Sequence, residues 1–551
     1  MTISPLHCST CRAPVYRFTR VPPSPIPHLL GTNKVPSTAE AQSIRALIAA
    51  ARSDISHLDA GIARAQHVLA QLIKEREALK VYVDEHAAFL TPARRMPDEI
   101  WSEIFLHCLP TTDVIRNGQR SRASDQDPME LTSFGPGVAP ALLLRVCRDW
   151  AFIALSSPRL WSLIDLGASS HYLITDLTPV LIQTWLTRSQ QAPLTVMLSN
   201  YPYSISSFEN APARAVLAQS HRWRVANMQL WHASMDVFLS LRNNLPELEE
   251  LQLQFQGVTD SHLPGLDIFG DAPKLRRVTI HGPPQYPFAE IKLPWAQLTH
   301  FSLKELDGRS IHDLSSVLQL APDLLEVEWT LSQPPQLQIN PSEIVQHPRL
   351  RDLSVFMWSD PGSSFDCLDL PSLRRLSYRT SRLSTAKWSW SKSEAFIVRN
   401  GQALQSFQLD ATAVKGSELV ACLGAMPALS ELRLSFWDFS GDAANLEELI
   451  RSLCYTGAWP DTTIVQALST ITIDCHIKDA PNIAEIVTMF IDMVESRWQA
   501  HRYLSYRREV SHLRWASLNV HGLREFTIDQ ADEERLERLN AEGLAVEVSY
   551  R

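Results

Sequence analysis

Side chains that could carry out chemistry are scattered along this sequence, and few of them share a spacing that serves a reaction. Cys8 and Cys11 form a single C-x2-C pair, with His7 beside it. Because a structural zinc site needs four ligands, we interpret this pair as two free thiols in a tail. The sequence has no glycine-rich phosphate loop, H-E-x-x-H helix or G-x-S-x-G turn. We therefore predict no enzymatic activity, cofactor or metal, and leave open only a site assembled from distant residues.

The composition is typical of a folded protein and not of a disordered or fibrous one. Of the 551 residues, 45% are hydrophobic and 20% are charged, and the formal net charge is −9. Such a mildly acidic chain disfavours nucleic acid as a partner. The chain contains no run of 18 apolar residues, so we expect no membrane-spanning helix and no membrane partner. Eight sparse cysteines favour a reducing compartment, which predicts a cytoplasmic or nuclear location.

A disordered tail is expected over residues 1–36, and a long helix over 37–91. Residues 1–39 hold seven prolines and no acidic residue, whereas Ser37 and Glu40 have the spacing of a capping box. Apolar residues then recur in steps of three and four, interrupted only at Arg76. These residues are Ile48, Ala51, Ile55, Leu58, Ile62, Ala65, Leu69, Leu72, Leu79 and Val83. The repeat predicts a coiled coil with another helix or with a second copy; an amphipathic helix folded back on its own protein is the alternative.

Three short helices are predicted within residues 92–166. The run MPDEIWSEIFLHCLP at 96–110 begins with a proline and two acids, which favour a helix start, and ends at a proline. Residues 111–139 are polar, contain glycine and proline, and are expected to form a disordered insert. A second helix is expected over 140–154, and the run SSPRLW at 156–161 predicts a last short helical piece. One side of the second helix is expected to carry Leu143, Val146, Cys147, Trp150 and Ala154.

The runs MPDEIWSEIFLHCLP, LLLRVCRDW and SPRLW resemble the F-box, and over 96–166 the chain resembles the large fungal family of F-box-like proteins. The resemblance implies helices that bind the small adaptor subunit of SCF-type cullin–RING ubiquitin ligases. The adaptor-facing positions of that family correspond here to Pro97, Ile100, Ile104, Leu109, Leu143, Val146 and Trp150. Two features depart from the family pattern: Met96 replaces the usual leucine, and the insert at 111–139 replaces a short link and could shield the adaptor surface.

A physical reason supports a partner for these helices. About forty residues in three short helices cannot stabilise a core of their own, so their outward apolar side chains should be covered by another chain. The alternative is a helical subdomain that packs on the repeats behind it.

From residue 246 onward, a phrase with apolar residues at its first, fourth and sixth positions recurs nine times. Its first positions are Leu248, Leu275, Leu298, Leu324, Leu350, Leu373, Leu404, Leu429 and Leu468. Most of the spacings lie in or near the range of leucine-rich repeats, each of which supplies one short parallel strand. The residues between the fourth and sixth positions are all polar. We therefore expect an α+β (α/β) solenoid over 167–551, an irregular leucine-rich-repeat horseshoe with a polar concave face.

Other segments of this region extend the pattern. Trp358 and Trp437 stand where such repeats usually carry asparagine, and we expect them in the core. A helix, turn and strand are predicted from Trp185 to Leu198. At the end we expect a helix at Ile483–Val494, strands at Trp515–Val520 and Phe526–Ile528, a helix at Asp532–Leu539 and a strand at Ala545–Val548.

Together, these patterns predict a substrate-receptor subunit of a ubiquitin ligase. The F-box-like helices would dock the adaptor, and through it the cullin, and the repeats would bind a target protein that the sequence does not identify. A non-degradative interaction scaffold dimerised through the coiled coil is the alternative.

Overall fold

The structure is a computed structural model of the chain, which separates into two compact units, Met1–Ile100 and Trp101–Arg551. Among the described residues, none of the helices has the length and apolar character that crossing a membrane requires. The described residues are 21–109, 138–166, 178–198, 211–231, 235–256, 267–281, 291–304, 311–331, 344–357, 364–380, 388, 390–411, 414–436, 443–455, 464–476, 483–503, 513–521 and 528–550.

The first unit consists mainly of one long helix, α1 (Thr38–Phe89). Its start has the predicted capping box: the Ser37 backbone N–H donates to Glu40 Oε2 at 2.8 Å, and the Glu40 N–H donates to Ser37 Oγ at 3.4 Å. The helix was expected over 37–91, and in the structure it begins one residue later and ends two residues earlier. Pairing of this helix with another one stays a prediction.

The second unit is built on a parallel sheet of 14 strands, in which nearly every strand pairs with the next one along the chain. This order is the arrangement of a leucine-rich-repeat-like solenoid. The strands are β1 (Leu163–Asp165), β2 (Leu194–Leu198), β3 (Trp223–Trp231), β4 (Glu250–Gln256), β5 (Arg277–His281), β6 (His300–Lys304), β7 (Glu326–Leu331), β9 (Asp352–Met357), β11 (Arg375–Thr380), β12 (Ser406–Ala411), β13 (Glu431–Phe436), β14 (Thr470–His476), β15 (Trp515–His521) and β16 (Ala545–Tyr550). A separate pair is formed by β8 (Val345–Gln346) and β10 (Leu368–Asp369).

The repeated phrase determines the register of this sheet. The fourth positions of the nine phrases pair directly across the strands, from Leu251 with Val278 at one end to Leu432 with Ile471 at the other. All three apolar positions of each of the nine phrases are buried. The polar residues between them are half-buried or exposed. The predicted strand pattern is therefore confirmed. In a β-strand, successive side chains point to opposite faces of the sheet, so apolar and polar residues alternate. The horseshoe curvature stays a prediction.

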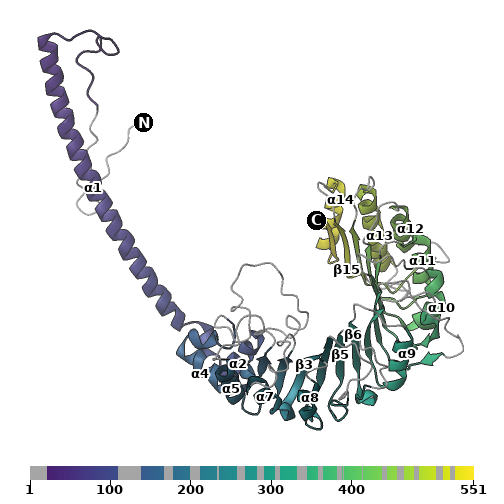
Figure 1. Cartoon of the computed structure of the whole chain (residues 1–551). Coiled ribbons are helices and arrows are strands. Elements are labelled where there is room, and N and C mark those ends of the chain that lie inside the picture. The colour runs from purple at the N-terminus through teal and green to yellow at the C-terminus, as the bar shows by residue number, and fades with distance from the viewer. Residues whose placement is uncertain are drawn as a thin grey trace. The chain divides into compact units, whose positions relative to one another are not determined.

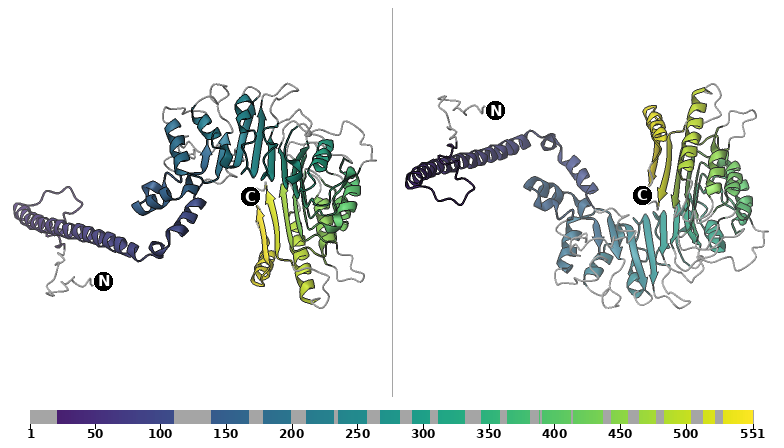
Figure 2. Two further views of the ribbon diagram at one scale, coloured as in Figure 1. Left: turned by 90° about the horizontal axis from the view of Figure 1, so that it is seen from below. Right: turned by 90° about the horizontal axis from the view of Figure 1, so that it is seen from above.

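Helices occupy the return segments between strands, and α9 to α14 lie along one face of the sheet (Figure 1). From α10 to α14, consecutive helices pack on one another. The two further views show the same layering of helices against strands (Figure 2). The helices of the second unit are α2 (Asp98–His107), whose first turn belongs to the first unit, α4 (Arg148–Ser156), α5 (Thr178–Arg188), α7 (Ala211–Leu217), α8 (Met235–Phe238), α9 (Ile311–Leu320), α10 (Trp390–Asn400), α11 (Gly416–Gly424), α12 (Ala443–Leu453), α13 (Ile483–Tyr503) and α14 (Gln530–Ala541). Short 3-10 turns include η1 (Pro92–Arg95), η3 (Leu143–Arg145) and η4 (Pro158–Trp161).

The helix expected over 140–154 is not continuous. Cys147 has an extended backbone (φ −157°, ψ 172°) and separates η3 from α4, where its Sγ accepts a hydrogen bond from the Trp150 N–H. Cys147 thus acts as the N-cap of a new helix. The five residues expected on one side consequently do not share it. Leu143 and Ala154 are buried, Val146 and Cys147 are exposed, and Trp150 is half-buried.

Most other predicted elements are present. The strands expected near 194–198, 515–520 and 545–548 are β2, β15 and β16, and α13 is longer than the predicted helix. The sequence did not predict β1, which is short and buried at every position, or β3, which alternates without the leucine phrase. Phe526, Trp358, Trp437 and most of the insert at 111–139 lie outside the described residues, as do residues 1–20 of the tail.

Tyr378 provides a test of how the core is packed. Its ring is fully buried between the rings of Phe365 and Phe407, and its hydroxyl has no hydrogen-bond partner among the described residues. A buried hydroxyl without a partner costs on the order of 1 kcal/mol or more. We expect Tyr378→Phe to leave the free energy of unfolding equal or to raise it by up to about 1 kcal/mol. Urea unfolding measures the change; a loss of stability would show that the hydroxyl has a partner.

Candidate functional site

Helix α2 is held on α4 by aromatic rings. The Trp150 ring centroid lies 5.1 Å from that of Trp101 and 4.9 Å from that of Phe105. Around this contact, Ser102 Oγ and Ser157 Oγ lie 2.8 Å apart. Next to it, the Arg159 guanidinium donates to Glu103 Oε1 at 2.6 Å, an exposed pair that adds little stability. These contacts fix α2 on the segment that leads into the sheet.

The predicted adaptor-facing residues divide into two groups by exposure. Ile100, Ile104 and Val146 are exposed, with exposed fractions of 49%, 38% and 52%, and Pro97 is exposed as well. Leu143 is buried (4%), and Leu109 and Trp150 are half-buried against the core. The exposed group can contact a partner directly. The other three residues can only support that surface from below in this conformation.

Three exposed apolar residues were not singled out from the sequence. Phe152 is 66% exposed, and Leu155 and Leu142 are exposed as well. Phe152 and Leu155 share a face of α4 because they are three residues apart, and the opposite face of that helix buries Ile153 and Ala154. The segment RDWAFIALS is therefore apolar on more than one face, and this property was the signal in the sequence.

Trp161 joins the helices to the sheet. It is fully buried, and its Nε1–H donates to the Ala154 carbonyl at 2.8 Å. Its ring packs edge-on against Trp185 of α5 at 4.8 Å, and the Arg188 guanidinium lies 4.3 Å above it. As expected, these helices do not form a separate core. Their inner side belongs to the same hydrophobic core as the repeats, whereas their outer apolar side chains remain exposed.

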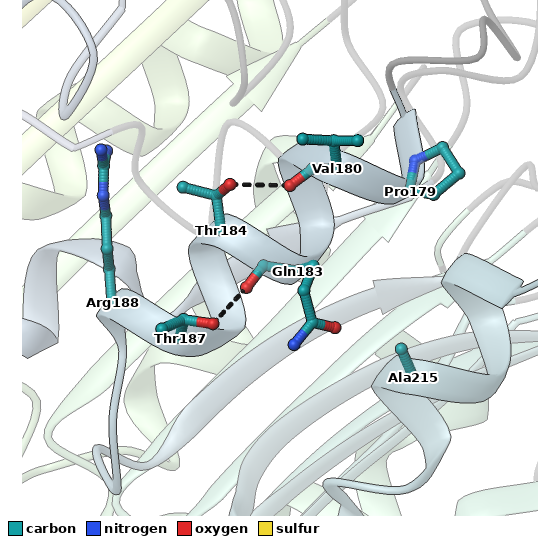
Figure 3. Close-up of a pocket in the computed structure, with 7 residues that line it drawn as sticks. All are labelled: Pro179, Val180, Gln183, Thr184, Thr187, Arg188 and Ala215. Carbon is teal, nitrogen blue, oxygen red and sulfur yellow. Dashed lines mark hydrogen bonds between the residues drawn. The ribbon is translucent and has the colours of Figure 1, made fainter.

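A groove of about 570 Å³ lies on α5, next to this joint (Figure 3). Val180 and Ala215 are among the residues that line it. The hydroxyls of Thr184 and Thr187 donate back to carbonyls of their own helix, at 2.7 Å each. The groove therefore presents mainly apolar surface, and it has no arrangement of side chains that would catalyse a reaction.

The polar face of the sheet carries a network of charged side chains. Over β4 to β7 it lines a groove of about 320 Å³. Glu328 accepts hydrogen bonds from Ser302 at 2.9 Å and from Arg379 at 2.7 Å, and it lies 3.4 Å from Lys304. Burial raises the pKa of Glu328, but the two cations outweigh burial and hold it below its ordinary value. Such a mixed-charge face is suited to discriminating between protein partners.

His281 lies in the same groove and makes the stability of this region depend on pH. Its Nε2 lies 2.6 Å from Gln252 Nε2. Burial, together with the charge of Lys304, lowers its pKa to about 4. A histidine with a lowered pKa stabilises the fold fully above its unfolded pKa of about 6.5. This stabilisation is lost as the pH falls toward 4, because the unfolded chain binds the proton more readily.

We therefore expect the free energy of unfolding to fall by on the order of 2 kcal/mol between pH 7 and pH 4.5 through this histidine. In His281→Asn that part of the pH dependence should disappear. Urea unfolding of both proteins at the two pH values measures the difference. Equal pH dependence in the two proteins would show that His281 is not the source of this loss of stability. Burial also lowers the pKa of His300, which remains in both proteins and acts in the same direction.

Within the described residues, the structure shows no candidate metal centre. No group of three or more His, Cys, Asp or Glu side chains that could hold a metal ion is found there. Burial raises the pKa of Cys475 to about 12 and that of Cys422 still further, which keeps both thiols protonated at neutral pH. Cys8 and Cys11 lie outside the described residues. The expectation that the chain is not an enzyme stays a prediction.

Comparison with known proteins identifies no family for this chain. No family model matches it, and no curated protein matches it. The solved structures that resemble it include a TLR13–ssRNA13 complex, with a TM-score of 0.32 and 14% identity over 65% of this chain and 52% of that chain. They also include a yeast Rad7–Elc1 complex, with a TM-score of 0.30 and 12% identity over 63% of this chain and 81% of that one. The chain thus spans about half the length of the first of these structures.

Proposed function

We propose that this chain is a substrate-receptor subunit of an SCF-type cullin–RING ubiquitin ligase. In this proposal the helices within 92–166 form an F-box that docks the ligase adaptor, and the sheet holds a target protein. The observation that carries the proposal is the set of exposed apolar side chains on α2, beside η3 and on α4. They lie in a region whose other apolar residues are buried in the core or half-buried against it.

The energetics of docking follow from that surface. Covering a large apolar side chain contributes about 1.5–3 kcal/mol before the costs of association are subtracted. Ile104, Val146 and Phe152 are therefore the residues expected to contribute most to adaptor affinity. Trp150 acts as a positioning residue, because its ring holds α2 on α4. Leu143 is buried in the core and is expected to support the surface from below.

Target recognition is assigned to the polar face of the sheet. The charged groups on it form ion pairs with each other, such as Arg375 with Asp352 and Arg379 with Glu328. A partner must offer groups that replace these pairs, since an unmatched charge at an interface costs several kcal/mol. This face is therefore suited to selecting one target among many.

Assembly with purified subunits tests the function. The full chain, the adaptor and the cullin are mixed, and the complex is separated by size-exclusion chromatography. We expect the three proteins to elute together, with the cullin retained only when the adaptor is present. A second preparation without residues 111–137 tests whether the insert shields the adaptor surface. Failure of both folded preparations to bind the adaptor at micromolar concentration would contradict the proposal.

The scaffold alternative is favoured by a different feature, the exposed seam of α1. It predicts a stable dimer with no affinity for the adaptor. The same assembly experiment therefore separates the two functions.

A further inference from the structure

The apolar seam of α1 is exposed along the helix. Seven of its large side chains have exposed fractions between 43% and 66%, at Ile48, Ile55, Ile62, Leu69, Leu72, Leu79 and Val83. Ile44 and Leu58 are half-buried. A helix of 52 residues is about 78 Å long at 1.5 Å per residue. Most of the stability of helices in proteins comes from packing of an apolar face. A helix of this length with an exposed apolar seam is therefore expected to pack against a partner.

The residue types in the seam indicate how many helices pair and in which direction. The a positions of the heptads are Ile48, Ile55, Ile62, Leu69, Arg76 and Val83, and the d positions are Ile44, Ala51, Leu58, Ala65, Leu72 and Leu79. Branched residues thus prevail at a, and leucine is the commonest residue at d. This combination favours two parallel strands.

The charges beside the seam allow a second copy of the same helix to pair in parallel. In a parallel pair in register, each g residue faces the e residue five positions later on the other copy. Glu75 then faces Lys80 of the second copy, an attractive contact. Asp54 faces Asp59 of the second copy, which is unfavourable, so the flanking charges are balanced in this arrangement.

Antiparallel pairing of the same helices brings together like charges only. Where the whole seam overlaps, e residues face each other and g residues face each other. Arg45 then faces Lys80, and Asp54 faces Glu75. A shift by one heptad still places Arg52 against Lys80. Charge complementarity therefore favours the parallel orientation.

We infer that α1 pairs in parallel and in register with α1 of a second copy of this chain. Arg76 specifies the register. Only in the in-register pair do the two Arg76 side chains face each other, so that every apolar position of one helix faces an apolar position of the other. On its own helix Arg76 already forms an ion pair with the exposed Glu77, which keeps the guanidinium at the edge of the seam. This inference does not depend on adaptor binding.

Disulfide trapping of the full chain tests orientation and register together. Ala51→Cys places a thiol at a d position, where equal residues of a parallel pair in register meet. Ser53→Cys places one at an outer position of the same turn and serves as the matched control. In either antiparallel arrangement the two introduced thiols at position 51 lie at least 25 residues apart along the pair, far beyond the reach of a disulfide.

Light scattering is expected to give twice the mass of one chain. Under mild oxidation, Ala51→Cys should form a disulfide between two positions 51, identified by peptide mapping, while Ser53→Cys and the unmodified chain should not. Cys108 and Cys147 are exposed, and the unmodified chain reports their background. A monomer at all concentrations, or a dimer in which position 51 fails to crosslink, would overturn the inference.

Arg76→Leu supplies a second measurement that does not depend on trapping. Replacing the charge with an apolar residue should tighten a parallel dimer in register, lowering its dissociation constant at least tenfold. A weaker dimer would overturn the assignment of Arg76 to the seam. Sedimentation equilibrium of the two full-length proteins measures the change.

Discussion

Replacing Ile104 with aspartate is expected to lower the affinity of the chain for the ligase adaptor by about a hundredfold or more. A carboxylate at this position would be desolvated against an apolar partner surface, and hot-spot residues contribute at least about 2 kcal/mol each. Val146→Asp should have an effect of similar size, since Val146 is more exposed than Ile104. Calorimetry or interferometry with purified adaptor measures both dissociation constants.

A matched control separates a local effect from unfolding. Val398 on α10 is 52% exposed, the same fraction as Val146, and it lies outside the proposed docking surface. We expect Val398→Asp to bind the adaptor as the unmodified chain does. If Ile104→Asp and Val146→Asp also bind normally, the docking surface is not on α2 and α4. Circular dichroism and unfolding curves confirm that all three variants are folded.

Trp161→Ala is expected to reduce the free energy of unfolding by about 3–5 kcal/mol. The substitution removes a fully buried ring, its contact with Trp185 and its hydrogen bond to the Ala154 carbonyl. Because Trp161 lies between α4 and the first strand, we expect hydrogen exchange to increase first in α2 and α4. Trp161→Phe should lose less, since it keeps most of the ring volume.

Trp515→Ala provides the control for this prediction. Trp515 lies on β15 and is 39% exposed, so the same truncation there removes much less buried surface. We expect a loss of no more than about 1 kcal/mol. Equal losses at the two positions, or unchanged exchange in α2 and α4, would contradict the role of Trp161 as the joint. Adaptor affinity of Trp161→Ala, measured at low temperature, shows whether the joint also positions the docking surface.

The sequence predicted the repeats well, because their signal is local and repeated. A strand with one buried face must alternate apolar and polar residues, and nine copies of one phrase made the alternation evident. The same argument would have found β3, whose residues alternate without the leucine phrase. The capping box of Ser37 and Glu40 was also predictable, since it depends on two residues three positions apart.

The candidate docking surface was predicted only in part. The exposed Ile100, Ile104 and Val146 agree with a surface that awaits a partner, whereas Leu143 is part of the core. The prediction of one continuous helix over 140–154 placed Leu143 and Val146 on the same side, so it could not distinguish the buried residue from the exposed one. The break at Cys147 changes which side chains face inward on either side of it.

By itself, the sequence determined the strands, their register and the exposed seam of α1, because each follows from a short period in residue type. The tertiary structure decided which apolar side chains of the three short helices are covered and which are not. That choice depends on Trp161 meeting Trp185 of the following repeat, and on α2 meeting α4 about fifty residues later in the chain. Contacts between residues so far apart in sequence leave no periodic pattern, so packing alone settles them.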